Sequence, residues 1–463
     1  MKTGTMIKVA AVAAAILNSP FSIFNSLHAA TINQVIVRQQ WPWSTDVKVE
    51  YQLEDVDAAH PVDIAVTAYN GDTPLPTANL ASAIKGDLYG VTEEFGEFYI
   101  DPIAAFGSER IAMTKFKVKL AVSDSAANIN EVIYKVFSLT NANEAVVDVT
   151  RRDLLNGTYG SVVTNYAAFG EDFATPLSDV VIWTGVTNNV KYKTSHLVMR
   201  KITCKGVQWM MGGDTVQTEL APACQVVLTN NFWISVFPVT IGQWDSLNDS
   251  WLATPSLHPS VGVYPVETNE CAVACSSIVV LRIQGSGGTS YPWPTYRHYV
   301  VGTSFLGRLR QKTRYDFELP TEAQWEFAAR GGNYGCDLYS GANGDVRKIA
   351  WDTRNSSPSG NSYCRHPVGS LCPNAYGLYD MLGTLTEYML NRYYEYDTEN
   401  VTYEPEGGDA TASLMYRSYT MFHSYQRVGA RILASDVSSN AARGIRLILP
   451  ENLVYPDSEK RAP

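Results

Sequence analysis

The sequence has few charged residues, and its basic residues form no run. Of the 463 residues, 18% are Asp, Glu, Lys or Arg, and the net charge at pH 7 is −10. Surfaces that bind nucleic acids depend on clustered Lys and Arg side chains, so this balance argues against a nucleic-acid partner. Aromatic residues reach 11% of the chain, a content typical of packed globular proteins and not of disordered ones.

Cysteine is missing from the N-terminal part of the chain and from its C-terminal end. The seven cysteines are Cys204, Cys224, Cys271, Cys275, Cys336, Cys364 and Cys372. Because the number is odd, at least one thiol has no partner within the chain. The C-x3-C spacing of Cys271 and Cys275 lacks the second ligand pair that a zinc site requires. We therefore expect structural cysteines, and no cysteine-linked lipid anchor near the N-terminus.

Two catalytic motifs are missing as well. The chain has no G-x-S-x-G motif, which positions the nucleophile of many serine hydrolases. It has no H-x-E or H-x-D motif either, and its histidines beyond the first thirty residues are scattered: His60, His196, His258, His298, His366 and His423. A non-haem iron centre needs two histidines and a carboxylate that converge on the metal. The sequence therefore supports neither class of enzyme.

The first thirty residues are typical of a secretory signal peptide. Lys2 and Lys8 precede the apolar run "VAAVAAAIL", and "SLHAA" at residues 26–30 offers small residues for cleavage. A membrane span is not supported, because "NSP" at residues 18–20 interrupts the apolar run well short of the length that crosses a bilayer. We expect residues 1–30 to be removed and the product to be periplasmic or secreted.

Period-two patterns dominate the next part of the chain. In "VKVEYQL" (residues 47–53) apolar residues alternate with polar ones, and "VDIAVTA" and "KFKVKLAV" repeat the arrangement. Such alternation predicts half-buried strands, and Asn70-Gly71-Asp72 predicts a turn between two of them. We predict an all-β, immunoglobulin-like sandwich over residues 31–150, followed by a connecting region over 151–194.

The composition changes from about residue 195 onward, where Trp and Gly become frequent. The pattern favours an irregular α+β domain over residues 195–450 and a C-terminal tail over 451–463. Two helices are predicted here, at 321–330 and around 374–382. In "LPTEAQWEFAARGG" Thr321 and Gln324 form a capping-box pattern that predicts a packed structural helix.

Five segments of this domain, in this order, resemble the formylglycine-generating enzyme, or sulfatase-modifying-factor, family. They are "VMRKITCKGVQWMMGG" (198–213), "FWISVFPVTIGQW" (232–244), "LPTEAQWEFAARGG" (319–332), "NAYGLYDMLGTLTEY" (374–388) and "GIRLIL" (444–449). The resemblance implies the fold of that family, an irregular domain related to the C-type lectin scaffold.

The same resemblance implies a pair of cysteines near the C-terminus that holds copper and oxidises a substrate cysteine. Here the corresponding segment, residues 416–446, contains no cysteine. Twelve residues separate Arg431 from Gly444, as in the family, and this register places Ser418 and His423 at the cysteine positions. Cu(I) prefers thiolate ligands, so we expect no copper site and no formylglycine generation by the known mechanism.

The resemblance also implies a structural calcium ion, held by backbone carbonyls and a glutamate. The matching segment runs from Gly383 to Tyr388. We predict the ligands to be the carbonyls of Leu382, Gly383 and Leu385 and the carboxylate of Glu387, a set of oxygen atoms that suits a hard cation. The alternative for Glu387 is a buried carboxylate that only accepts hydrogen bonds.

Two functions remain. The missing thiols favour an exported binding or display module, whose ligand is a peptide, a protein or a glycan. The alternative is a divergent oxidoreductase, of the formylglycine-generating or non-haem iron type, with relocated catalytic residues. Two of Cys271, Cys275, Cys336, Cys364 and Cys372 could then supply the thiols.

Overall fold

The computed structural model divides the chain into two compact units. It describes residues 30–40, 44–77, 79–107, 115–164, 180–213, 221–247, 268–274, 300, 302–332, 346–351, 354–356, 365–405, 407, 413–418, 427–433 and 443–451. Unit 1 comprises Met1–Glu131 and Thr150–Val162, and unit 2 comprises Val132–Val149 and Val163–Pro463. Within the described ranges no helix has both the length and the apolar character needed to cross a membrane.

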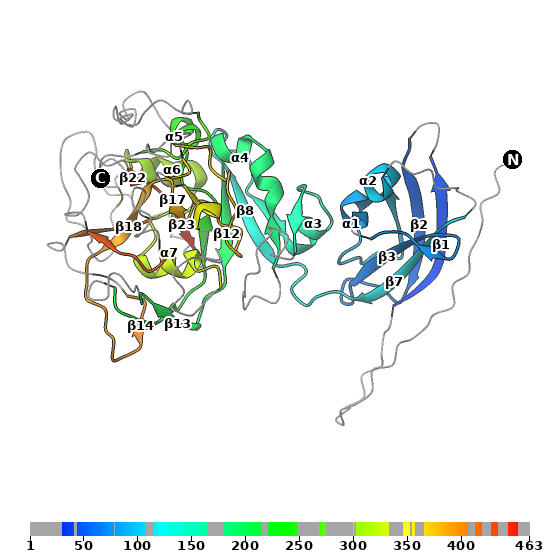
Figure 1. Cartoon of the computed structure of the whole chain (residues 1–463), viewed down its shortest axis with the longest axis horizontal. Coiled ribbons are helices and arrows are strands. Elements are labelled where there is room, and N and C mark those ends of the chain that lie inside the picture. The colour runs from blue at the N-terminus through cyan, green and yellow to red at the C-terminus, as the bar shows by residue number, and fades with distance from the viewer. Residues whose placement is uncertain are drawn as a thin grey trace. The chain divides into compact units, whose positions relative to one another are not determined.

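Unit 1 consists mainly of strands. Its elements are β1 (Thr31–Gln39), β2 (Val47–Glu54), β3 (Val62–Asn70), β4 (Thr73–Pro74), α1 (Leu80–Ala83), β5 (Ile84–Gly86), β6 (Phe95–Ile100), α2 (Pro102–Phe106), β7 (Phe116–Asp124) and α3 (Arg151–Leu155). The strands form two sheets, with the orders β1-β2-β6-β5 and β4-β3-β7 (Figure 1).

The two sheets of unit 1 share one hydrophobic core. Along β2 every second side chain is buried, from Val47 to Leu53, as the period-two pattern predicts. These residues pack with Ile64 of β3 and Val118 of β7, which belong to the other sheet. The β-rich character of this region is thus confirmed, while its description as an immunoglobulin-like sandwich stays a prediction.

The strands at residues 132–150 belong to unit 2, although the sequence analysis places them in the N-terminal domain. β8 (Val132–Ser138) pairs with a strand of unit 2, and β9 (Val147–Thr150) lies beside β8 in the same sheet. The segment that follows returns to unit 1, where the Asn156 side chain accepts hydrogen bonds from the backbone N–H groups of Leu88 and Tyr89. The chain therefore passes between the units more than once, and residue 150 does not separate two consecutive domains.

Unit 2 combines short strands with a few short helices. Its further elements are β10 (Val162–Val163, at the unit boundary), β11 (Ile182–Trp183), η2 (Thr184–Asn188), α4 (Lys191–Thr194), β12 (His196–Ile202), β13 (Gln208–Met211), β14 (Cys224–Val227), β15 (Phe232–Ser235), α5 (Ile241–Ser246), α6 (Phe305–Thr313), α7 (Glu322–Ala329), η4 (Val346–Lys348), β16 (Ala350–Trp351), β17 (Leu382–Gly383), β18 (Thr386–Arg392), β19 (Thr402–Tyr403), β20 (Leu414–Arg417), β21 (Ile432–Leu433), β22 (Arg443–Gly444) and β23 (Ile448–Pro450).

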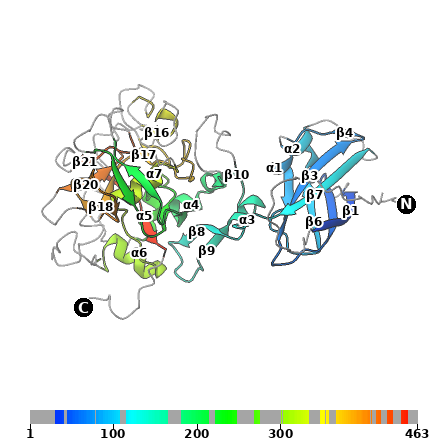
Figure 2. The same cartoon turned by 90° about the horizontal axis from the view of Figure 1, so that it is seen from below.

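The two largest sheets of unit 2 have five and four strands. The larger has the order β23-β15-β12-β8-β9, and the smaller has the order β21-β20-β18-β22. Figure 2 shows β18, β20 and β21 of the smaller sheet side by side. The sequence predicts an irregular α+β domain, and the structure shows a mostly β domain with few helices.

Helix α7 forms where the sequence predicts it. The Thr321 side chain accepts a hydrogen bond from the Gln324 N–H, and the Gln324 side chain accepts one from the Thr321 N–H. This capping box satisfies backbone donors that a helix leaves without partners at its start. The helix is buried almost all round, since both Trp325 and Phe327 are fully covered. It is therefore a core helix.

The helix predicted around residues 374–382 does not form. The Asn374 side chain instead accepts hydrogen bonds from the N–H groups of Tyr376 and Leu378, and Gly377 adopts a positive φ of 77°. Side-chain bonds of this kind give the backbone an alternative to a helix. Residues 374–382 thus form a turn that leads into β17.

Candidate functional site

The segment that resembles the family's catalytic region begins at the end of β20. Glu387 of β18 lies opposite Arg417 of β20 on one side and opposite Gly444 of β22 on the other. Ser418 follows Arg417 directly, so it lies just beyond the end of an inner strand of this sheet. Buried ion pairs connect the surrounding elements. They join Glu322 to Arg417 and Arg431, and Glu387 to Arg446.

Glu322, the first residue of α7, joins the helix to β20 and β21. Its carboxylate accepts hydrogen bonds from Arg417 Nε (3.1 Å) and from Arg431 Nε and Nη2 (3.0 and 2.7 Å). All three side chains are 0% exposed. Burial alone would raise the pKa of Glu322, but the charges of Arg431 and Arg417 outweigh it and hold the pKa below its usual range.

Glu387 joins β18 to α7 and to the segment after β22. Its carboxylate accepts hydrogen bonds from Trp325 Nε1 (2.6 Å) and from Arg446 Nε (3.1 Å). The remaining nitrogens of Arg446 donate to backbone carbonyls, among them Ser235 O and Tyr379 O. Burial raises the pKa of Glu387 despite the nearby guanidinium. Glu387 is thus a buried, hydrogen-bonded carboxylate, and its role as a cation ligand stays a prediction.

Asp380 lies close to Glu387, and the sequence analysis misses it. Its carboxylate accepts hydrogen bonds from the Gly369 N–H (2.7 Å) and from Thr384 Oγ1 (3.3 Å). Burial raises the pKa of Asp380, and its charge in turn raises the pKa of Glu387. The sequence did contain a signal for this residue, because Asp380 comes two positions before Leu382, the first of the predicted carbonyl ligands.

The surroundings of Glu387 are those of the predicted cation loop. Two buried carboxylates, of Asp380 and Glu387, lie near Arg446, and burial raises the pKa of both. Gly383 and Thr384 both have positive φ angles, of 74° and 55°, so the backbone turns sharply between the two acids. Among the described residues, no group of three or more His, Cys, Asp or Glu side chains is arranged so that it could hold a metal ion. A cation here would therefore depend on backbone carbonyls, as the prediction of Leu382, Gly383 and Leu385 requires.

Ser418 has a buried hydroxyl with a structural partner. Its Oγ donates a hydrogen bond to the Gly383 carbonyl oxygen at 2.9 Å, its exposure is 2%, and its φ is 64°. This contact connects the end of β20 to the predicted cation loop. His423, the second predicted replacement for a catalytic cysteine, lies outside the described residues.

The described cysteines are free thiols, and burial raises the pKa of three of them. Burial raises the pKa of Cys204 and of Cys224 to about 12, and it also raises the pKa of Cys372. Cys271 is buried as well. Cys275, Cys336 and Cys364 lie outside the part of the chain that the structure describes.

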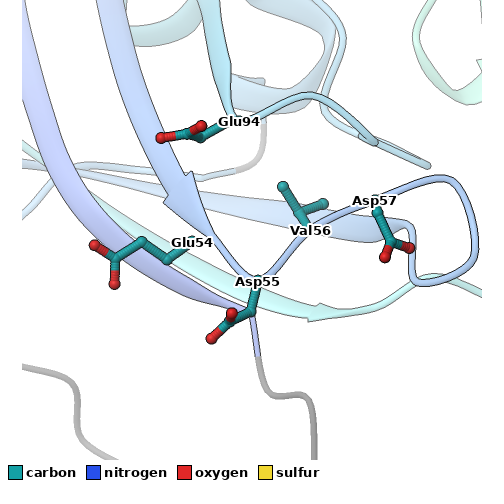
Figure 3. Close-up of a pocket in the computed structure, with 5 residues that line it drawn as sticks. All are labelled: Glu54, Asp55, Val56, Asp57 and Glu94. Carbon is teal, nitrogen blue, oxygen red and sulfur yellow. The ribbon is translucent and has the colours of Figure 1, made fainter.

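Unit 1 contains a pocket lined mainly by acidic residues. Its lining consists of Glu54, Asp55, Val56, Asp57 and Glu94. All four carboxylates are exposed, and Figure 3 shows that they point in different directions and do not converge on one point. Asp57 accepts hydrogen bonds from the His60 and Ala59 N–H groups, which lower its pKa. The pocket is a solvated acidic surface.

Comparisons with known proteins identify the larger part of the chain. A family model described as the sulfatase-modifying factor enzyme 1-like domain matches residues 188–449. The chain is 33% identical over 227 residues to a serine/threonine-protein kinase pkn1 of Chlamydia pneumoniae, covering 49% of this chain and 33% of the relative. It is 34% identical over 144 residues to a formylglycine-generating enzyme of Streptomyces coelicolor, covering 28% of this chain and 45% of the relative.

The chain thus spans less than half of the length of these two relatives. Among solved structures, the Treponema denticola variable protein 1 aligns at 22% identity and a TM-score of 0.39, covering 55% of this chain and 95% of that one.

Proposed function

We propose that this chain, which belongs to the sulfatase-modifying factor enzyme 1-like family, is a ligand-binding member that does not generate formylglycine. The observation that carries the proposal is the state of Ser418, whose buried hydroxyl donates to the Gly383 carbonyl. A hydroxyl is a poor ligand for Cu(I), which selects thiolates. The intact ion pairs of Glu322 and Glu387 nevertheless hold the family scaffold around this position.

The proposed ligand is a peptide, a protein or a glycan, which would bind on the aromatic surface beside Ser418. Trp351 of β16 pairs with Gly383 of β17, and its ring stacks on His366 with the centroids 3.7 Å apart. Both rings are half-buried. A partly exposed aromatic pair offers an apolar face, which suits stacking against a peptide side chain or a sugar ring. In this proposal the N-terminal unit is an immunoglobulin-like spacer, and the protein is exported.

The alternative is a divergent oxidoreductase with relocated catalytic residues. Thiol chemistry with copper requires thiolates, whereas burial raises the pKa values of Cys204, Cys224 and Cys372. Of these three, only Cys372 is among the cysteines that the alternative would use, and its raised pKa favours the binding module.

Copper titration distinguishes the two functions. We expect the double variant Ser418→Cys, His423→Cys to bind one more Cu(I) ion per chain than the wild-type protein, because two thiolates can complete a linear site. The matched control is Ser418→Cys alone, for which we expect no such gain. If the wild-type protein already binds Cu(I) tightly and stoichiometrically, the ligands must be other cysteines, and the oxidoreductase is favoured instead.

Calcium is proposed as a structural ion of the Asp380–Glu387 loop. We expect added Ca²⁺ to raise the melting temperature of unit 2 and EDTA to lower it. The variant Asp380→Asn should lose this response, while Asp57→Asn, at an exposed carboxylate of unit 1, should keep it. An equal response of both variants, or no response of the wild-type protein, would contradict the site.

The effect of calcium should depend on pH. The pKa values of Asp380 and Glu387 are raised in the folded state. Without the ion, the stability that these groups contribute is fully present below their unfolded pKa values and is lost as the pH rises through the folded ones. A bound cation favours the ionised carboxylates and removes this loss. The calcium-dependent rise in melting temperature should therefore be larger at neutral pH than at acidic pH.

A further inference from the structure

We propose that Ser195, His196 and Glu144 form a second site on unit 2, which transfers acyl groups from small esters by way of a serine nucleophile. Ser195 Oγ lies 2.9 Å from His196 Nδ1, and Glu144 Oε1 lies 3.4 Å from His196 Nε2. Two successive contacts thus connect a nucleophile to a base, and the base to an acid that orients it. The proposal is independent of the binding function proposed for the Ser418 region.

Three elements of unit 2 bring these residues together. Ser195 follows α4, His196 begins β12, and Glu144 lies between β8 and β9. The pairing of His196 with Ser138 holds β12 beside β8, and the Leu139 N–H donates to the Ser195 carbonyl at 2.8 Å. The backbone of the site is therefore fixed by a sheet.

The hydrogen bonds select the imidazole tautomer that activates a serine. Since the Glu144 carboxylate only accepts hydrogen bonds, His196 must donate to it from Nε2–H. Nδ1 then carries a lone pair that faces the Ser195 hydroxyl at 2.9 Å, while the second acceptor near this hydroxyl, the Lys191 carbonyl oxygen, is farther away at 3.4 Å. The Ser138 hydroxyl and then His196 hold the pKa of Glu144 below its usual range, so the carboxylate stays charged and stabilises an imidazolium.

The accessibility of the three side chains favours a small substrate. Ser195 and His196 are half-buried, while the side chain of Glu144 is 42% exposed.

The sequence gives no sign of this arrangement. Ser195 does not lie in a G-x-S-x-G motif, and Glu144 comes before both of its partners in the chain. A relay of this type is defined by the geometry of its side chains and not by their spacing in the sequence.

The reaction balances with an ester and water alone. As Ser195 Oγ bonds to the carbonyl carbon, its proton moves to His196 Nδ1. The bond from that carbon to the alcohol oxygen then breaks, and the alcohol leaves with the proton from Nδ1. Water repeats the two steps on the acyl-serine, which releases the carboxylic acid and restores the hydroxyl.

Acetylation by p-nitrophenyl acetate tests the proposal on the full chain. We expect nitrophenol release with an acetyl group on the peptide that contains Ser195, detected by mass spectrometry. Ser195→Ala should abolish this label, and His196→Gln should slow its formation by about 10²–10⁴-fold, the usual contribution of a general base. Ser246→Ala is the matched control and should label normally, because the Ser246 hydroxyl donates only to the carbonyls of Thr194 and Gly242, whereas the Ser195 hydroxyl also contacts an imidazole nitrogen.

A charge-removing variant separates a base from a merely structural histidine. Glu144→Gln keeps the size of the side chain but cannot stabilise an imidazolium by charge, so it should slow labelling without unfolding the protein. Lys191 of α4 also lowers the pKa of Glu144, and the ring of Tyr192 lies edge-on to the imidazole of His196. Unchanged labelling in Ser195→Ala, or folded wild-type protein that acquires no label at Ser195, would overturn the proposal.

Discussion

Replacing Glu322 with glutamine should lower the free energy of unfolding of unit 2 by about 3–5 kcal/mol, the usual cost of removing one partner from a buried ion pair. Glutamine keeps the shape of the side chain but leaves the guanidiniums of Arg417 and Arg431 without their shared carboxylate. Both side chains are 0% exposed, so water cannot replace the lost charge. We expect the melting temperature of unit 2 to fall by roughly 6–20 °C.

An exposed ion pair of unit 1 supplies the control for this variant. Glu50 contacts Arg38 and Lys48 on the surface of the first sheet. Surface pairs contribute about 0–1 kcal/mol, so Glu50→Gln should change the melting temperature little. If Glu322→Gln lowers the melting temperature as little as Glu50→Gln does, the buried ion pairs do not hold the scaffold together.

Glu322→Gln should also change how the stability of unit 2 depends on pH. The pKa of Glu322 is lowered in the folded state, so the stability it contributes is present above its unfolded pKa and is lost as the pH falls through the folded value. Wild-type unit 2 should therefore lose stability on acidification. This loss should be smaller in Glu322→Gln, and denaturant unfolding at several pH values measures the difference.

Elements with a strong local pattern were predictable from the sequence. The start of helix α7 is encoded locally, because the side chains of Thr321 and Gln324 accept hydrogen bonds from each other's backbone N–H groups. Strand β2 alternates between buried and half-buried residues because one of its faces covers a core. In both cases the information lies within a few residues of the element.

Where the prediction was wrong, distant parts of the chain decide the structure. β8 carries buried residues on both faces, including Tyr134 and Phe137, so its assignment to unit 2 depends on pairing with β12 rather than on alternation. Residues 374–382 have apolar content that suits a helix, yet the Asn374 side chain competes for the backbone donors.

The candidate site was predictable only in part for the same reason. The family resemblance identified Glu387 and Ser418, but Arg446 reaches Glu387 from 59 residues away and Ser235 O from 211 residues away. No local pattern indicates such contacts. The Ser195–His196–Glu144 arrangement depends in the same way on Glu144, which lies 52 residues from the histidine.

Formylglycine formation is the activity that the Ser418 region should lack completely. The family mechanism oxidises a substrate cysteine at a copper ion held by thiolates, whereas Ser418 has a buried hydroxyl bonded to Gly383. No cysteine follows Cys372 in the chain. The wild-type protein should therefore leave a cysteine-containing sulfatase peptide unchanged.

Mass spectrometry of that peptide, after incubation with the purified protein and oxygen in the presence and absence of copper, measures this most directly. A formylglycine-generating enzyme provides the positive control. We predict that the peptide keeps its cysteine under both conditions. Conversion to the aldehyde by the wild-type protein would contradict the binding module and would place the catalytic thiols among the cysteines from Cys271 to Cys372.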